Sequence, residues 1–142
     1  MTLIHATTIQ LGAHGVMIMG DSGAGKSDLA LRLIADGALL VSDDQTQLSL
    51  IDSRLHATAP KTIAGHIEAR HLGIVPAPQI EAAVVRLAVQ LTNKPIERMP
   101  GPATWTPPGV AGAPQIPLIP LAAFEPSAAV KLKLALISVA NS

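Results

Sequence analysis

The chain has 142 residues, a length typical of one domain with its own core, and its 10 Lys and Arg residues balance its 10 Asp and Glu residues. This balance argues against nucleic acid as the main partner, because binding to a phosphate backbone needs a basic excess or stripe. Cys is absent, which excludes disulfides and thiolate metal sites. With neither a secretory signal nor an apolar run of membrane-spanning length, we expect a soluble cytoplasmic protein without a membrane partner.

The first predicted elements are a strand, a glycine-rich loop and a helix. Residues 15–19 form a short apolar run that is typical of a strand buried on both faces. From Lys26 onward apolar residues recur at helical spacing, and Gly37 is suited to the C-terminal end of that helix. A second buried strand is predicted over residues 38–41. We therefore expect an α/β fold.

The rest of the chain continues the same domain. Strand character returns at residues 47–51, 82–91 and 116–121. Most of the prolines lie within residues 95–126, which we predict to be loop and edge strand because proline lacks a backbone donor. Residues 127–139 alternate like a strand, but their Ala and Leu content favours a helix, and we predict a helix. No domain boundary is indicated, so residues 1–142 are predicted to be a single domain.

The glycine-rich loop fits the pattern G-x-x-x-x-G-K-[ST] of a phosphate-binding loop, and the flanking strand and helix disfavour a chance match in a glycine-rich turn. Its backbone N–H groups and the helix N-terminus would face phosphate oxygens. Lys26 is expected to reach the β- and γ-phosphates of ATP, and the Ser27 hydroxyl to bind Mg²⁺. The predicted nucleotide-binding residues are Gly20, Asp21, Ser22, Gly23, Ala24, Gly25, Lys26 and Ser27.

Two adjacent carboxylates, Asp43 and Asp44, follow the second predicted strand. Phosphoryl transfer needs a carboxylate near the metal and one that takes a proton from the acceptor hydroxyl. Because neighbouring strand residues point to opposite sides, one carboxylate can orient the metal or loop while the other faces the acceptor. The alternative is a solvated turn, since Asp favours turns, but the nearby phosphate-binding loop favours a functional role.

Other polar residues carry weaker signals. Glu68 and Arg70 would lie on one side of an extended segment, and the residues alone favour a surface ion pair over a site. Arg98 lies in the proline-rich stretch, where nothing local distinguishes it. The five His residues show no H-x-x-x-H pairing, which argues against zinc.

Two segments resemble the HPr kinase/phosphorylase family. IHATTIQLGAHGVMIMGDSGAGKSDLALRLIADGALLVSDD resembles the catalytic domain, and APKTIAGHIEARHLGIV resembles the family signature L-x-E-I-R-G-L-G-I. Together they cover about half of the chain in the family's order. The resemblance implies a single domain with a P-loop-containing sheet, similar to phosphoenolpyruvate carboxykinase. It also implies ATP- and Mg²⁺-dependent phosphorylation of a serine on HPr, a bacterial sugar phosphotransferase protein, and phosphorolysis of that phosphoserine.

The resemblance also implies roles for individual residues. It assigns Mg²⁺ to Ser27 and Glu68, and it makes Asp44 the proton acceptor with Asp43 beside it. Two further residues of the chain match residues of the family's active site. His5 matches the family's active-site histidine, and Arg98, in IERMP, matches the arginine of an R-L-G motif.

Three departures from the family bear on regulation and on the reverse reaction. We expect the chain to begin at the catalytic domain, without the family's N-terminal domain, and the segment after Ile74 is shorter than in the family. These two departures leave homo-oligomerisation open. The family's P-K-x-x-x-P-V-R-P-G-R-N segment corresponds to residues 117–129, PLIPLAAFEPSAA, which contain no Lys or Arg. We therefore expect weak or absent phosphorylase activity.

The sequence thus predicts an HPr serine kinase. The alternative from another class is a nucleotide-gated binding module with little turnover, which would not need the proton acceptor that the adjacent carboxylates offer. A small-molecule kinase is disfavoured, because 142 residues leave little room for a closed substrate pocket.

Overall fold

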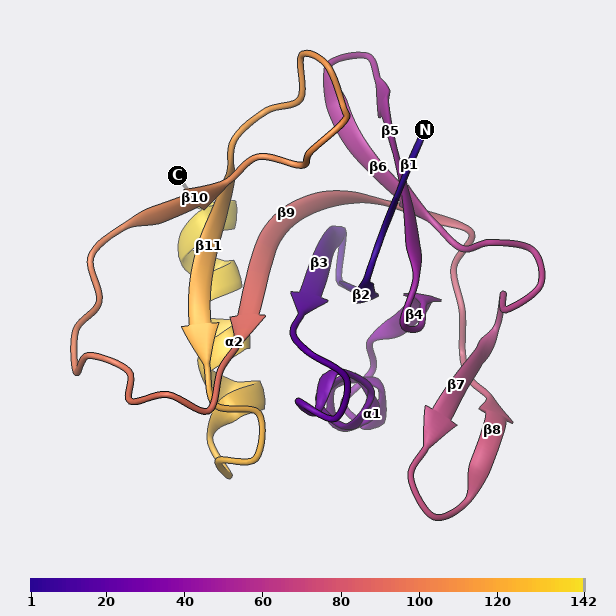
Figure 1. Cartoon of the computed structure of the whole chain (residues 1–142), viewed down its shortest axis with the longest axis horizontal. Coiled ribbons are helices and arrows are strands. Elements are labelled where there is room, and N and C mark those ends of the chain that lie inside the picture. Colours follow the sequence, from indigo (N-terminus) through magenta and orange to yellow (C-terminus); the bar gives the residue numbers. More distant parts are fainter. Residues whose placement is uncertain (142) are drawn as a thin grey trace.

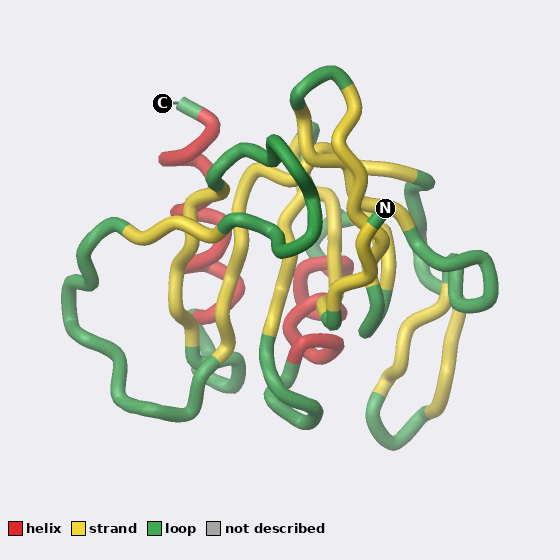
Figure 2. Tube along the Cα trace, turned by 45° about the horizontal axis from the view of Figure 1, so that its top comes forward, coloured by secondary structure: helices red, strands yellow, loops and turns green. Residues whose placement is uncertain are grey.

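The computed structural model describes residues 1–141 and has an α/β architecture, in which two helices pack on one face of a curled, mixed sheet (Figures 1 and 2). The helices are α1 (Lys26–Ala35) and α2 (Ala128–Ala140). The strands are β1 (Thr2–Ile4), β2 (Ala6–Leu11), β3 (His14–Met19), β4 (Leu39–Ser42), β5 (Thr46–Ile51), β6 (Arg54–Thr58), β7 (His66–Ala69), β8 (Gly73–Pro76), β9 (Ala82–Leu91), β10 (Ala103–Trp105) and β11 (Ile116–Leu121).

The main sheet has the strand order β1-β5-β6-β9-β3-β2-β4, and β9 also pairs with β11, which pairs with β10. Strand β3 runs parallel to β9, and β2 is antiparallel to both β3 and β4. Strands β3 and β4 therefore run in the same direction, so their C-terminal ends reach the same edge of the sheet. This edge carries the loop at residues 20–27 and the carboxylates that follow β4. Strands β7 and β8 form a separate hairpin that projects beside the sheet (Figure 1).

The sheet is buried on both faces, and the central strand β3 illustrates this. Val16 and Ile18 belong to a core formed with the two helices. Met17 and Met19 belong to a second core on the opposite face, together with residues of β5, β6 and β9. Since successive side chains of a strand point to opposite faces, an uninterrupted apolar run is needed here, as the sequence predicted.

The two helices cover the first core with leucines spaced four residues apart. Leu29 and Leu33 of α1 are fully buried, and Leu132 and Leu136 of α2 are buried beside them. This spacing places each pair on one face of a helix. The C-terminal segment is therefore the predicted helix and not the alternative strand.

The predicted strands within residues 15–51 and at residues 82–91 and 116–121 are confirmed, as are both helices. The residue patterns did not predict β1, β2, β6, β7 or β8. The proline-rich stretch contains the expected edge strand, β10, whereas β11 is paired on both sides. No helix within residues 1–141 is long and apolar enough to cross a bilayer.

Leu87 in β9 offers a test of the helix-facing core. Its side chain is fully buried, so Leu87→Ala should lower the free energy of unfolding by about 2–5 kcal/mol, through lost apolar contacts and a cavity. Urea unfolding measures this change. The matched control is Leu134→Ala on the outer face of α2, where the side chain is 61% exposed and the expected change is below about 0.5 kcal/mol. Equal losses in the two variants would contradict this description of the core.

Candidate active site

The loop between β3 and α1 has a backbone that only glycine adopts without strain at two positions. Gly23 has a φ of 83° and Gly25 a φ of 102°. Gly25 is also constrained by space, because an added Cβ would lie 2.8 Å from the Cβ of Ala123 and 2.9 Å from Cζ of Phe124. The loop therefore keeps a fixed path between the end of β3 and the start of α1.

The N-terminus of α1 is open to an anion. Within residues 1–141, no side chain caps this terminus. The N–H groups of the first helical turn have no carbonyl acceptor within the helix, as at any helix N-terminus. The helix dipole adds positive potential at the same place. Lys26 is buried, and its Nζ donates hydrogen bonds to the carbonyl oxygens of Gly20 (2.8 Å) and Asp21 (3.2 Å). This geometry supports the predicted phosphate-binding loop.

The Asp43 carboxylate connects three elements at this edge of the sheet. Its Oδ1 accepts hydrogen bonds from Thr7 Oγ1 of β2 at 2.9 Å and from Ser27 Oγ of α1 at 2.6 Å. Its Oδ2 accepts one from the backbone N–H of Glu68 in β7 at 2.8 Å. The side chain is buried, so these donors replace the water that an ionised carboxylate would otherwise bind. Asp43 therefore positions the neighbouring groups of the site.

Asp44 has a different environment from Asp43. Its φ is 65°, a left-handed conformation that Asp tolerates, and its backbone N–H donates to Thr7 Oγ1 at 3.1 Å. Its Oδ1 lies 2.7 Å from Nε2 of His5, and the Asp44 side chain is 63% exposed. Asp44 thus offers an accessible carboxylate, held by His5, directly beside the buried Asp43. This difference fits the prediction that the two carboxylates have different roles, although those roles stay a prediction.

The groups around Asp43 suit Mg²⁺ chemically. Ser27 Oγ and the Asp43 carboxylate offer oxygen atoms, the ligand type that Mg²⁺ prefers. Within residues 1–141, no group of three or more His, Asp and Glu residues is arranged to hold a metal. A nucleotide-bound Mg²⁺ needs only one or two protein ligands, since phosphate oxygens and water complete its octahedral shell. Glu68 lies beside Asp43 through its backbone, and its exposed side chain stays a predicted ligand.

Two predicted arginines are not part of this cluster of contacts. Arg70 is exposed in the turn that follows β7, and Arg98 is exposed in the loop between β9 and β10. Neither makes a hydrogen bond or ion pair within the described residues, so the surface ion pair considered for Glu68 and Arg70 is not formed. Their functional roles stay predictions.

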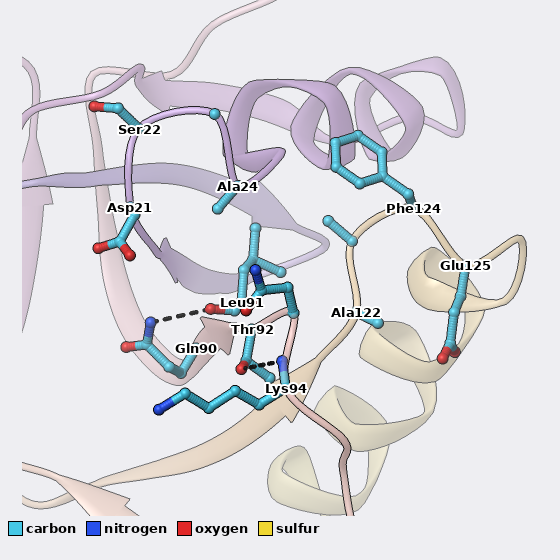
Figure 3. A pocket seen from close by; sticks show the side chains of 13 residues that line it. Asp21, Ser22, Ala24, Gln90, Leu91, Thr92, Lys94, Ala122, Phe124 and Glu125 are labelled. Carbon is cyan, nitrogen blue, oxygen red and sulfur yellow. Dashed lines mark hydrogen bonds between the residues drawn. The ribbon is translucent and has the colours of Figure 1, made fainter.

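Two features of the site were not predicted from the sequence. The first is Thr7, a fully buried residue that joins the two carboxylates, and it was missed because β2 was not predicted. The second is a groove of about 880 Å³ on the side of the loop that faces β9 and β11 (Figure 3). Its lining comes from three separate segments, residues 21–24, 90–94 and 122–125, which no local pattern connects.

Comparison with known proteins points to one family. Residues 1–93 match the family model described as HPr Serine kinase C-terminal domain. A protein named HPr kinase/phosphorylase from Clostridium beijerinckii is 40% identical over 74 residues, which are 52% of this chain and 24% of the relative. One of the same name from Clostridium tetani is 37% identical over 79 residues, 56% of this chain and 26% of the relative. The chain thus matches about a quarter of the length of these relatives.

A solved structure shares the fold over nearly the whole chain. It is described as the structure of the Hpr(Ser) kinase/phosphatase from Coxiella burnetii, and it superposes with a TM-score of 0.82. The match covers 97% of this chain and 95% of that chain at 23% sequence identity. This likeness confirms the predicted α/β fold class, including the part that follows residue 93.

The Asp43 contacts predict a structural cost for its replacement. Asn has one oxygen in place of two, so Asp43→Asn leaves at least one of the three donors without an acceptor. We expect the free energy of unfolding to fall by about 1–3 kcal/mol, measured by urea denaturation. The control is Asp44→Asn, whose exposed side chain makes its one hydrogen bond within residues 1–141 to His5, so its effect on stability should be clearly smaller. The reverse order would contradict the assignment of Asp43 as the structural carboxylate.

Proposed function

The chain belongs to the family of HPr serine kinase C-terminal domains, and we propose that it is a protein kinase that uses ATP and Mg²⁺ to phosphorylate a serine of HPr. The observation that carries this proposal is the hydrogen-bonded series from Ser27 through Asp43 and Thr7 to Asp44. It places an accessible carboxylate beside the loop that is suited to phosphates. A site that only bound a nucleotide would have no need for such a group.

In the proposed reaction, the loop at residues 20–27 holds the phosphates with its N–H groups and Lys26. Asp44 accepts the proton of the serine hydroxyl as the serine oxygen bonds to the γ-phosphorus and the bond to the β–γ bridging oxygen breaks. ADP leaves with that bridging oxygen. His5 holds the Asp44 carboxylate in place through its 2.7 Å contact. Mg²⁺, when bound, would offset the negative charge of the phosphates, and Ser27 and Glu68 are the residues that would hold it.

We propose that the forward reaction dominates. Phosphorolysis brings inorganic phosphate against phosphoserine, and two such anions need cationic side chains to hold them together. Residues 117–129 contain no Lys or Arg. Lys131, the next cation along the chain, is bound to Glu125, with Nζ and Oε2 2.6 Å apart. The forward reaction needs less positive charge, because its acceptor is a neutral hydroxyl.

The main test mixes the purified protein with ATP, Mg²⁺ and HPr from the same organism. Mass spectrometry should then locate one phosphate on an HPr serine. Asp44→Asn should lower the rate of transfer about a hundred- to ten-thousand-fold, because a general base acts on the transferring state, and calorimetric affinity for ATP should hardly change. Nucleotide binding without any transfer would instead support the nucleotide-gated binding module.

The proposed metal role of Glu68 has its own test. Glu68→Gln should raise the Mg²⁺ concentration needed for half-maximal kinase activity and leave the thermal unfolding midpoint nearly unchanged. Glu81→Gln is the matched control, because Glu81 is also an exposed glutamate. It precedes the N-terminal end of β9, whereas the phosphate-binding loop lies near the C-terminal end of that strand. If Glu68→Gln changes only the unfolding midpoint, the residue is structural.

The direction of the reaction is tested with phosphoserine-HPr and inorganic phosphate. We expect pyrophosphate release to be much slower than forward transfer under matched conditions, because residues 117–129 contain no Lys or Arg and Lys131 is paired with Glu125. An enzyme-coupled pyrophosphate assay measures it. Pyrophosphate release at a rate comparable to the forward rate would refute this part of the proposal.

A further inference from the structure

The groove at the loop lies on the side opposite the carboxylates. Strand β3, which leads into the loop, has β9 on one side and β2, followed by β4, on the other. The groove is formed by the C-terminal end of β9, the turn after β11 and the loop itself, whereas Asp43 and Asp44 follow β4. The phosphate-binding loop therefore separates a cavity from a proton acceptor, and Figure 3 shows the cavity side.

We propose that this groove binds the nucleoside half of ATP, with the ring of Phe124 against the base. The triphosphate then runs along residues 20–27, with its γ end toward Asp44. This inference rests on the proposed kinase function and adds the location and residues of nucleoside recognition. It also leaves the Asp44 side free for the acceptor protein.

The size and lining of the groove suit a nucleoside. Its volume of about 880 Å³ falls within the range of about 300–1,000 Å³ that is usual for small-molecule sites. Leu91 and Phe124 provide apolar surface, and Asn93 provides an amide that can both donate and accept hydrogen bonds. Lys94 adds a cation, and its ammonium group makes no hydrogen bond or ion pair within residues 1–141.

Phe124 is the strongest candidate for contact with the base. It is the only Phe of the chain, and its side chain is 65% exposed although it lies in a cavity wall. Aromatic side chains favour contact with a nucleobase because every base has a π-face. The ring also lies against the phosphate-binding loop, since a Cβ added to Gly25 would meet it at 2.9 Å. A base stacked on Phe124 therefore lies within reach of phosphates on the loop.

The turn that carries Phe124 is fixed to the helix that follows the loop. Arg32 of α1 donates from Nη2 to the carbonyl oxygen of Ala123 and from Nη1 to that of Glu125 at 3.4 Å. Its guanidinium group also pairs with Asp28, one turn earlier in α1, at 3.2 Å. These contacts hold the turn at a set position relative to α1. The groove wall and the phosphate-binding loop thus act as parts of one site.

The test compares ATP with inorganic tripolyphosphate, which has the phosphates but no nucleoside. Calorimetry in the presence of Mg²⁺ measures both affinities for the wild-type protein and four variants. Phe124→Ala should weaken ATP binding about fivefold or more and leave tripolyphosphate binding unchanged. Lys26→Ala should weaken binding of both. Met99→Ala, an 84% exposed apolar residue outside the groove, should change neither.

Each other outcome overturns a defined step. If the wild-type protein binds both ligands but Phe124→Ala leaves ATP affinity unchanged, or weakens both ligands equally, the groove assignment is wrong and the kinase proposal stands. If ATP binds no more tightly than tripolyphosphate, the groove does not hold a nucleoside. If neither ligand binds, the proposed function itself fails. Phe124→Trp, which keeps an aromatic face, should retain ATP affinity, and its loss would also contradict stacking.

Discussion

The candidate site depends on the burial of one polar group, the Asp43 carboxylate. An ionised carboxylate removed from water destabilises the protein unless hydrogen-bond donors surround it. Here the donors come from β2, α1 and β7, segments that are far apart in the sequence. The need to satisfy this group therefore holds three elements at fixed positions around it. Because Ser27 is one of the donors, the same requirement fixes the start of α1, where the phosphates are proposed to bind.

The sheet provides the rigid base for this arrangement. Strand β3 packs with one face against the helices and with the other against the second core, so packing on both faces holds it in place. The loop begins where β3 ends, and the two carboxylates begin where β4 ends, at the same edge. A rigid base would matter for the proposed phosphoryl transfer, because in such reactions the protein contributes mainly by positioning groups and by electrostatics.

Local patterns carried the predictions that succeeded. The strand, loop and helix over residues 15–37 have glycines, an apolar run and helical spacing, all of which depend on neighbours in the sequence. Strand β2 was missed because Thr7 and Thr8 in its first half are polar, and only the tertiary structure shows that both are buried. Strand β6 follows a two-residue turn of Asp52 and Ser53, both with positive φ, which is a weaker sequence signal than Asn-Gly. The groove is lined by three segments that are far apart in the sequence, so no local pattern could predict it.

Lys26 has a consequence for the energetics of ligand binding. Its ammonium group is already bound to the carbonyl oxygens of Gly20 and Asp21, and its chain is buried. A free lysine loses about 1.5–2 kcal/mol of rotamer entropy when it is ordered. In this protein that loss occurs on folding, before any phosphate arrives. A nucleotide bound as proposed would thus meet a lysine whose ordering is complete, and its binding would exchange hydrogen bonds at almost constant side-chain entropy.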